Sequence, residues 1–489
     1  MTSIAITKGV VDTLIYLQMV NRHGLIAGAT GTGKTVTLKV LTEKLSKEGI
    51  PVFLADIKGD LSGLAKAGQW TPKLEERYKL IGITDPFEPQ AFPVRLWDVF
   101  GQAGHPVRAT VEGMGSLFLS RLLDLNETQT GILAIVFKLA KEKEWPLIDL
   151  KDLQSLLKEV YEHSSEYSAH YGNITKQSVG AIQRSLLVLE EEGADQFFGE
   201  PALDLNDFMQ LDASGRGYIN ILSATKLFHS PKLYSTFLIW MLSRLFETLP
   251  EVGDPEKPKL VFFFDEAHLL FKDASKLFLE KVEQVVRLIR SKGVGIYFIT
   301  QNPQDLPESV LAQLGNRIQH ALRAYTPKEM KAIKVAAQSF RPNPDFDTET
   351  VITELGTGEA LVSFLNEKGQ PSVVERTFIL SPQSSFDLLN ESEQLALITT
   401  SSFHQKYATA IDRESAYEKL AAKASKEVQE EKKEAEKERS VTEKTEQKRS
   451  PGRPRKSSLE KAKDSFLSSL FRTIAREIAK LIMGSFKQK

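Results

Sequence analysis

The segment GATGTGKT, residues 28–35, constrains the fold of this chain more than any other feature. It matches the pattern G-x-x-x-x-G-K-[ST], whose glycines let backbone N–H groups wrap around phosphate groups. The preceding segment GLIAG (24–28) is typical of a short buried strand, and VTLKVLTEKLSKEG (36–49) is typical of an amphipathic helix. A strand, a glycine-rich loop and a helix in this order predict a nucleotide-binding α/β domain.

We expect this loop to bind the phosphates of ATP through residues Gly28, Ala29, Thr30, Gly31, Thr32, Gly33, Lys34 and Thr35. Lys34 would reach the β- and γ-phosphates, and the hydroxyl of Thr35 would bind Mg²⁺ at the positive end of the following helix. The alternative is a chance match, and the strand–loop–helix context argues against it.

A second feature is FFFDEAHLL (262–270), where Asp265 and Glu266 follow three phenylalanines. Adjacent carboxylates at the end of an apolar strand repel each other and are costly to bury without partners. A metal ion at the P-loop would supply the compensating charge, so we assign Asp265 to Mg²⁺ and Glu266 to the general base that activates water. The alternative is that Asp265 caps a helix containing His268, for which a structural hydrogen-bonding role is expected.

The segment GVGIYFITQNPQDLP (293–307) predicts another buried strand, which ends at Thr300 and is followed by Gln301. A polar amide at that tip would contact the γ-phosphate or the attacking water; ordinary turn chemistry is the alternative. The preceding helix carries Arg287 and Arg290 one turn apart. Either guanidinium, supplied to a neighbouring subunit, would stabilise charge during phosphoryl transfer, whereas the alternative is a solvated basic helix end.

Further strands are predicted at 52–57, 217–222, 317–324 and 360–365, with a helix around 327–339. At the end of the first of these, Asp56 and Asp60 flank a Lys-Gly turn, and we favour a loop-capping role for them over assistance to the metal. Alternating strands and helices predict an α/β fold with a mostly parallel sheet, covered on both faces, and ATP at its C-terminal edge.

Helical periodicity dominates residues 105–210, which are too many for an ordinary connection and indicate an inserted subdomain. We therefore divide the chain into a first part of the ATPase core (1–104), a helical insertion (105–210), a second part of the core (211–400), a charged linker (401–460) and an amphipathic C-terminal helix (461–489).

Composition narrows the setting of the protein. The chain has no cysteine, which suits a reducing compartment. Its formal net charge is −1, so the chain as a whole provides no basic field that would attract nucleic acid. No window is long and apolar enough to span a bilayer, so we expect a cytoplasmic protein. Residues 426–449 hold eight Lys/Arg and eight Glu, which predicts a solvated single helix or a disordered linker.

Two segments of the C-terminal tail are candidates for binding other molecules or other parts of the protein. PGRPRK (451–456) is similar to the core of a minor-groove-binding motif, although such runs are also common in linkers. Residues 464–486 carry a continuous apolar stripe and a basic opposite face. We expect this helix to dock on its own ATPase domain or to bundle with its copies; binding to an anionic membrane surface is the less favoured alternative.

Taken together, GATGTGKT, VFLADIKGD, KLVFFFDEAHLLF, VVRLIRSKGVGIYFITQNP and LGNRIQHALRAYTP resemble the HerA/FtsK superfamily of ring-forming ATPase motors, in particular a HerA-like branch of the YjgR type. The resemblance covers about residues 20–380. It implies a RecA-like core, homo-hexamers with ATP at subunit interfaces, and an arginine acting in trans. It supports the roles given to Lys34, Thr35, Asp265, Glu266 and Gln301, and it adds Arg317 as a third candidate arginine.

One departure limits the resemblance. HerA helicases carry an N-terminal β-barrel before the ATPase and work with a nuclease, whereas only about two dozen residues precede the P-loop here. The barrel's role is therefore not transferred.

The preferred function is a Mg²⁺-dependent ATPase motor acting on double-stranded DNA, as a translocase or helicase. The alternative is a motor or switch acting on a protein partner, as in secretion ATPases. A small-molecule kinase is disfavoured, because a kinase must exclude water and Glu266 is suited to activating it.

Overall fold

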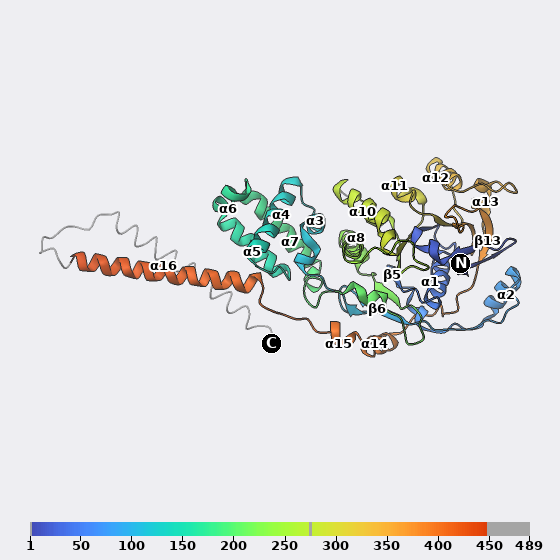
Figure 1. The fold of residues 1–489 in the computed structure, drawn as a ribbon, viewed down its shortest axis with the longest axis horizontal. Helices are drawn as coiled ribbons and strands as arrows, with labels where there is room; N and C mark the ends of the chain where they lie inside the picture. The colour runs from blue at the N-terminus through green and yellow to red at the C-terminus, as the bar shows by residue number, and fades with distance from the viewer. Residues whose placement is uncertain (1, 273–275, 447–489) are drawn as a thin grey trace. The chain divides into compact units, whose positions relative to one another are not determined.

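The computed structural model describes residues 2–272 and 276–446, and Figure 1 shows the path of the chain. Residues up to Leu420 form one compact unit, and the chain from Ala421 onward belongs to a second. All strands of the described residues, and the predicted nucleotide-binding motif, lie in the first unit.

A large sheet forms the centre of the first unit. In the described residues it has 11 strands, in the order β2 (Thr7–Gly9), β13 (Glu375–Ile379), β12 (Glu359–Ser363), β11 (Asn316–Gln319), β4 (Gly24–Ala27), β10 (Val294–Thr300), β9 (Leu260–Phe264), β5 (Val52–Asp56), β8 (Ile219–Ser223), β6 (Val94–Asp98) and β7 (His105–Pro106). Neighbours from β11 to β7 run parallel, whereas the pairs β11–β12, β12–β13 and β13–β2 are antiparallel. Strands β1 (Ser3–Ala5) and β3 (Leu14–Tyr16) form a separate antiparallel pair. The predicted α/β class with a mostly parallel sheet is confirmed.

The two faces of the sheet are buried in different cores, because successive strand residues point to opposite sides. Phe262 and Phe264 of β9 pack in the core that includes α8 (Pro231–Thr248) and α10 (Lys276–Leu288). Phe263, between them, packs in the core that includes α1 (Lys34–Lys47). Burial on both faces explains why the central strands are continuously apolar.

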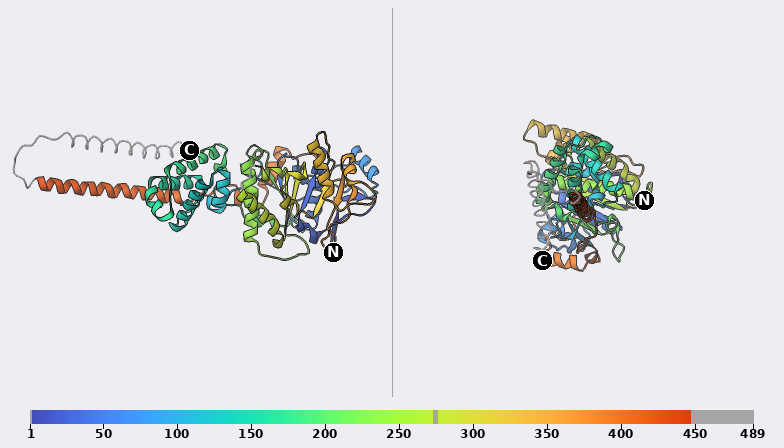
Figure 2. Two further views of the ribbon diagram at one scale, coloured as in Figure 1. Left: turned by 90° about the horizontal axis from the view of Figure 1, so that it is seen from above. Right: turned by 90° about the vertical axis from the view of Figure 1, so that its left-hand side faces the viewer.

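Residues 105–210, for which a helical insertion is predicted, contain α3 (Val111–Leu122), α4 (Glu127–Glu142), α5 (Leu150–Glu162), α6 (Ser164–Tyr171) and α7 (Lys176–Glu191), which gather in one group in Figures 1 and 2. Side-chain caps explain where several of these helices begin. Asn126 and Asp149 form reciprocal capping boxes at α4 and α5, and the hydroxyl of Thr110 accepts from the backbone of Gly113 at α3.

The remaining helices are short, apart from α16: α2 (Pro72–Ile81), α9 (His268–Phe271), α11 (Glu308–Leu311), α12 (Pro327–Gln338), α13 (Thr348–Glu354), α14 (Glu391–Thr399), α15 (His404–Tyr407) and α16 (Ala416–Glu446). The helix predicted around 327–339 is confirmed as α12. The strand predicted at 317–324 ends at Gln319, because the chain then leaves β12 and turns toward the P-loop, where Ala321 O accepts from Ala29 N at 2.8 Å.

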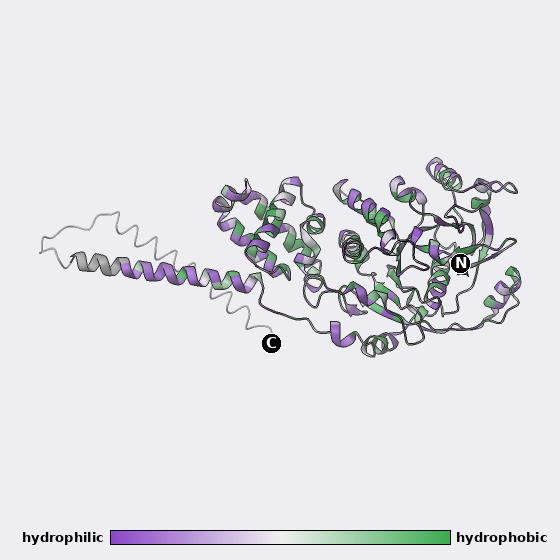
Figure 3. Cartoon of the chain, in the orientation of Figure 1, coloured by the Kyte–Doolittle hydropathy of each residue, from purple (hydrophilic) through white to green (hydrophobic). Residues whose placement is uncertain are grey.

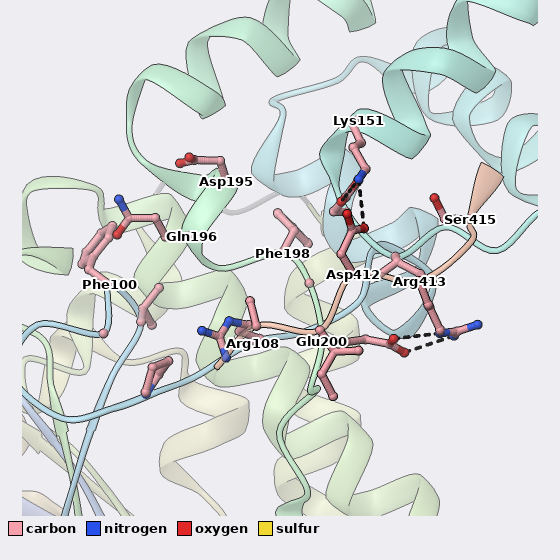
Figure 4. A pocket seen from close by; sticks show the side chains of 18 of the residues that line it. Phe100, Arg108, Lys151, Asp195, Gln196, Phe198, Glu200, Asp412, Arg413 and Ser415 are labelled. Carbon is pink, nitrogen blue, oxygen red and sulfur yellow. Dashed lines mark hydrogen bonds and ion pairs between the residues drawn. The ribbon is translucent and has the colours of Figure 1, made fainter. Parts of the chain in front are cut away.

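The predicted start of the charged linker at residue 401 is wrong. Phe403 and Tyr407 are buried, and the Tyr407 ring lies 5.4 Å from that of Trp97. Farther along, Asp412 pairs with Lys151 at 3.1 Å, and Arg413 forms two hydrogen bonds with Glu200 (Figure 4). These aromatic and ionic contacts hold residues 401–420 in the first unit, although their composition is polar. The boundaries at 104 and 210 stay predictions.

The cavity that Figure 4 shows, of about 430 Å³, lies beside this segment. Its lining, as far as the chain is described, includes no residue of the P-loop or of the tips of β9 and β10. We therefore do not connect it with nucleotide binding.

Of the two structures predicted for residues 426–449, the described part, up to Glu446, is helical. Helix α16 runs without a break in Figure 1, and Figure 3 shows it to be mostly hydrophilic as far as it is coloured. PGRPRK (451–456) and the predicted helix at 464–486 lie outside the described residues. A search of the described helices finds no segment with the length and hydropathy that a membrane crossing requires.

Candidate nucleotide-hydrolysis site

The predicted phosphate loop connects β4 to α1, as its sequence requires. Gly33 is the N-cap of α1 with φ 117°, a conformation that favours glycine. A side chain at Gly28 would also be excluded, since its Cβ would lie 2.5 Å from the Cβ of His320. The loop is therefore built from glycines for steric reasons, and it leads backbone N–H groups into the positive end of a helix.

Lys34 is buried at the start of α1 and folds back over the loop. Its ammonium donates to Gly28 O at 2.6 Å and to Ala29 O at 2.9 Å. The pKa of Lys34 is lowered, mainly by burial and further by the nearby Lys58, whereas Glu266 and Asp265 oppose the decrease. The ammonium of Lys34 therefore lies at the loop, where neutral carbonyl groups accept its hydrogen bonds. A bound phosphate would be a stronger acceptor because it is charged.

The carboxylates lie at the carboxyl end of β9, across from the P-loop lysine. Asp265 Oδ1 accepts from the backbone N–H of Glu266 at 2.9 Å, and Asp265 O accepts from the hydroxyl of Tyr234 at 3.0 Å. Burial raises the pKa of Asp265 and Lys58 opposes that rise. Asp265 is not the cap of the following helix, whose N-cap is Ala267.

Glu266 has an unusual backbone conformation for a residue with a side chain, with φ 48°. Such strain costs on the order of 1–3 kcal/mol and is concentrated at functional sites. Glu266 is buried, and its carboxylate is surrounded by polar groups: Lys58 Nζ at 3.2 Å, His268 Nδ1 at 3.4 Å and Gln301 Nε2 at 3.5 Å. The structure therefore brings Gln301, from the tip of β10, to the residue proposed as the general base.

The sequence motifs do not single out Lys58. It lies in the turn after β5, and its ammonium contacts both Asp265, at 3.5 Å, and Glu266, at 3.2 Å. The turn is formed by Asp56, which accepts from the backbone of Gly59, Asp60 and Leu61, so the loop-capping interpretation is confirmed for Asp56. The signal was present in the sequence as a lysine between two aspartates at a strand tip.

Asp56 and Asp60 differ in their surroundings. Burial raises the pKa of Asp56 to about 6, although the backbone donors of the turn oppose the rise. Asp60 Oδ2 instead accepts from Thr35 Oγ1 at 3.4 Å. Asp60 is therefore the aspartate of this turn that lies next to the predicted metal-binding hydroxyl.

The three candidate arginines are in different environments. Arg290 pairs with Asp254 at 2.7 Å, and Arg287 is exposed near the end of α10. Arg317 donates to the backbone carbonyls of Leu311, Leu314 and Ser339. Arg317 is thus engaged in holding its own chain together, whereas Arg287 faces solvent.

A sequence model of the family described as "Helicase HerA-like C-terminal" matches residues 4–489. This chain belongs to the HerA-like helicase C-terminal family. It is 24% identical over 357 residues to the DNA double-strand break repair helicase HerA of Saccharolobus solfataricus, a match covering 72% of this chain and 63% of that protein. The protein of the same name in Sulfolobus acidocaldarius is 22% identical over 377 residues, covering 72% and 64%. The chain therefore spans less than two thirds of the length of these relatives.

Solved structures similar to this HerA-like chain include the unbound monoclinic form of the bacterial conjugative coupling protein TrwBdeltaN70, with a TM-score of 0.48 and 15% identity, covering 78% of this chain and 90% of that one. VirB4 of Thermoanaerobacter pseudethanolicus has a TM-score of 0.48 and 17% identity, covering 78% and 96%. The expected membership of the HerA-like P-loop ATPases is confirmed by the family match.

The HerA-like chain has the donor set for Mg²⁺ with a nucleotide. Oxygen atoms are the ligands that Mg²⁺ prefers, and Thr35 and Asp265 would supply them near Lys34, while Asp60 lies next to the Thr35 hydroxyl. In the part of the chain that the structure describes, no group of three or more His, Asp or Glu side chains forms a metal cage by itself. Such a site would use phosphate oxygens and water to complete the coordination of Mg²⁺, which polarises the phosphates when bound.

Proposed function

We propose that this chain is a Mg²⁺-dependent ATPase that assembles as a hexameric ring and moves double-stranded DNA. The observation that carries the hydrolysis step is the arrangement at Glu266. Its buried carboxylate lies at the tip of β9, within reach of Gln301, on the sheet edge that also bears the phosphate loop. A carboxylate in that position activates water, and the amide beside it orients the water or contacts the γ-phosphate.

The roles of the loop residues follow from the same geometry. The N–H groups of Gly28 to Thr35 would bind the phosphates, Lys34 would neutralise the β- and γ-phosphates, and Thr35 with Asp265 would hold Mg²⁺. ATP and Mg²⁺ are therefore the proposed ligands. A general base next to the phosphate site favours hydrolysis over phosphoryl transfer to a small molecule.

DNA as the load is supported by family membership and by the relatives named as DNA double-strand break repair helicases. The near-neutral net charge is compatible with this proposal, since a ring needs only a few basic side chains at its pore to contact phosphates. A protein load remains the alternative to be tested.

The test is the ATPase rate of the full chain with and without double-stranded DNA, at about 50 and 200 mM salt. We expect DNA to stimulate the rate at low salt and to do so less at high salt, because phosphate contacts release counterions. Hydrolysis that DNA does not change at either salt concentration would favour the protein load.

A further inference from the structure

A cavity of about 400 Å³ lies directly beside the phosphate loop. The P-loop contributes Gly33 and the first turn of α1 contributes Val36, while the opposite walls include Leu74, Arg77, Phe87 and Phe386. Its volume is within the range of roughly 300–1,000 Å³ that is usual for small-molecule sites. The cavity is thus continuous with the loop at which the phosphates are proposed to bind.

The cavity and the phosphate loop share one wall. Gly358 lines the cavity, and its backbone N–H donates to Thr32 O at 3.0 Å. A Cβ on Gly33 would lie 3.2 Å from Gly358, so the two glycines are in close backbone contact. Arg77 fixes the other side of this wall by donating to Gly358 O at 2.8 Å and to Ile379 O at 3.0 Å.

The direction of a bound nucleotide follows from the positions of the charged groups. The γ-phosphate must lie near Glu266, because the attacking water is activated there. That end of the site also holds Asp265 and Lys58, which are charged and partly buried. The α-phosphate and the nucleoside must therefore leave the loop at its other end, where Gly33 and Val36 open into the cavity.

The walls of the cavity suit a flat, uncharged group. Leu74 and Phe87 are half-buried apolar side chains, and Phe87 belongs to an aromatic cluster in which its ring lies 6.0 Å from that of Trp70 and 6.2 Å from that of Tyr78. Phe386 is 63% exposed at the cavity, and the ammonium of Lys39 lies 5.0 Å from its ring centre. A stacked base would cover apolar surface that water contacts otherwise.

We propose that this cavity receives the base and sugar of the nucleotide, that Leu74 and Phe87 pack against them, and that Arg77 positions the wall shared with the phosphate loop. The proposal rests on the proposed function, since it needs the phosphates to bind at residues 28–35. It adds specificity-determining residues outside the loop, in the segment between β5 and β6 and in the segment after β13.

The experiment compares two ligands on the full chain by titration calorimetry in the presence of Mg²⁺. ADP carries the nucleoside, whereas tripolyphosphate carries phosphates alone. Leu74→Ala and Phe87→Ala are the test variants. Leu80→Ala is the matched control, because Leu80 shares helix α2 with Leu74 but is 64% exposed and does not line the cavity.

We expect each test variant to bind ADP about tenfold more weakly than the wild type, the scale of losing one good apolar or aromatic contact. Tripolyphosphate affinity should stay unchanged in all variants, which also shows that the phosphate loop is folded in each of them. Leu80→Ala should behave as the wild type with both ligands.

Two results would overturn the proposal. One is an equal loss for ADP and tripolyphosphate. The other is wild-type ADP affinity in both test variants; if their oligomeric mass is then altered, the cavity is assigned to a neighbouring subunit. Failure of the wild type to bind tripolyphosphate or ADP would instead refute the proposed function itself.

Discussion

The ammonium of Lys58 lies 3.2 Å from Oε1 of Glu266 and 3.5 Å from Oδ2 of Asp265. Burial alone would lower the pKa of Lys58, but the two carboxylates outweigh it and raise the pKa above its usual value. Lys58 therefore stays protonated and supplies positive charge to the pair from within the chain. The register explains the contact, since Ala55 of β5 is paired with Phe264 of β9, so the two strand tips are adjacent.

We predict that Lys58→Ala makes ATP hydrolysis more sensitive to acid. Lys58 lowers the pKa of Asp265, against the effect of burial, so its removal raises that pKa further and a larger fraction of Asp265 is protonated at low pH. A protonated Asp265 does not bind Mg²⁺. We expect kcat/KM to fall by a larger factor at pH 6 than at pH 8, relative to the wild type. Lys58→Arg keeps the charge and should retain the wild-type profile; an equal loss at both pH values would contradict the electrostatic role.

Lys34→Ala should abolish ATP binding, because the variant lacks the charge that faces the β- and γ-phosphates. Lys44→Ala makes the same substitution in the last turn of α1 and serves as the control. Titration calorimetry with ATP and Mg²⁺ distinguishes the two. An ATP affinity equal to that of the wild type in Lys34→Ala would refute the phosphate site.

Glu266→Gln should bind ATP with near-normal affinity and hydrolyse it at least ~100-fold more slowly, the usual scale for losing a general base. Glutamine has the same shape, and its single carbonyl oxygen can accept from either Lys58 or Gln301, so the side chain keeps its place but one of the two contacts is lost. Glu280→Gln, an exposed position on α10, is the control. Near-normal turnover of Glu266→Gln in a single-turnover assay would move the base to another residue.

The site residues that can be predicted from the sequence are those that lie next to one another in the chain. Residues 28–35 and the pair Asp265–Glu266 each follow a strand directly, so the strand tip places them. Lys58 and Tyr234 contact the pair only because β5, α8 and β9 are neighbours in space, which spacing along the chain does not reveal. Gln301 lies between these cases, since its role depends on β10 pairing with both β4 and β9.

The same distinction explains the errors at element and domain boundaries. Residues 317–324 have the composition of a strand, but β11 ends at Gln319, where the chain turns to hydrogen-bond with the P-loop. Residues 401–420 have a polar composition, yet Phe403 and Tyr407 are buried against Trp97. In both segments a tertiary contact overrides the local pattern.

Arg290 has two candidate roles: action on a neighbouring subunit, and a local ion pair with Asp254. If Arg290 acts on a neighbouring subunit, then mixing Arg290→Ala with Lys34→Ala should restore part of the turnover, because one mixed interface has both an intact loop and an intact arginine. Arg290 also pairs with Asp254 at 2.7 Å, so Asp254→Ala is the control for that contact. The same test applies to the exposed Arg287. No rescue with either arginine, in particles confirmed to mix, would contradict the hypothesis.

His320 links the P-loop helix to the antiparallel side of the sheet. Its Nε2 lies 2.8 Å from Thr37 Oγ1 and its Nδ1 lies 2.9 Å from Glu359 O. A backbone carbonyl only accepts, so Nδ1 carries the proton and Nε2 accepts from the hydroxyl of Thr37. Both ring nitrogens are thus used by the neutral imidazole. Burial, with a further effect from Lys34, lowers the pKa of His320 from 6.5 to about 4.

We therefore predict that His320 contributes an acid-labile part of the stability. Between pH 6.5 and about 4 the unfolded chain binds a proton that the folded chain does not, so the free energy of unfolding falls as the pH is lowered. The loss attributable to this residue is at most ~3 kcal/mol over that interval. Denaturant unfolding of His320→Gln, whose amide bonds in both directions without titrating, should show a smaller decrease than the wild type from pH 6.5 to pH 4.5. His170, exposed on α6, provides the matched control, because His170→Gln leaves the wild-type slope unchanged if burial is the cause. Parallel slopes for His320→Gln and the wild type would show that the imidazole titrates alike in the folded and unfolded chains.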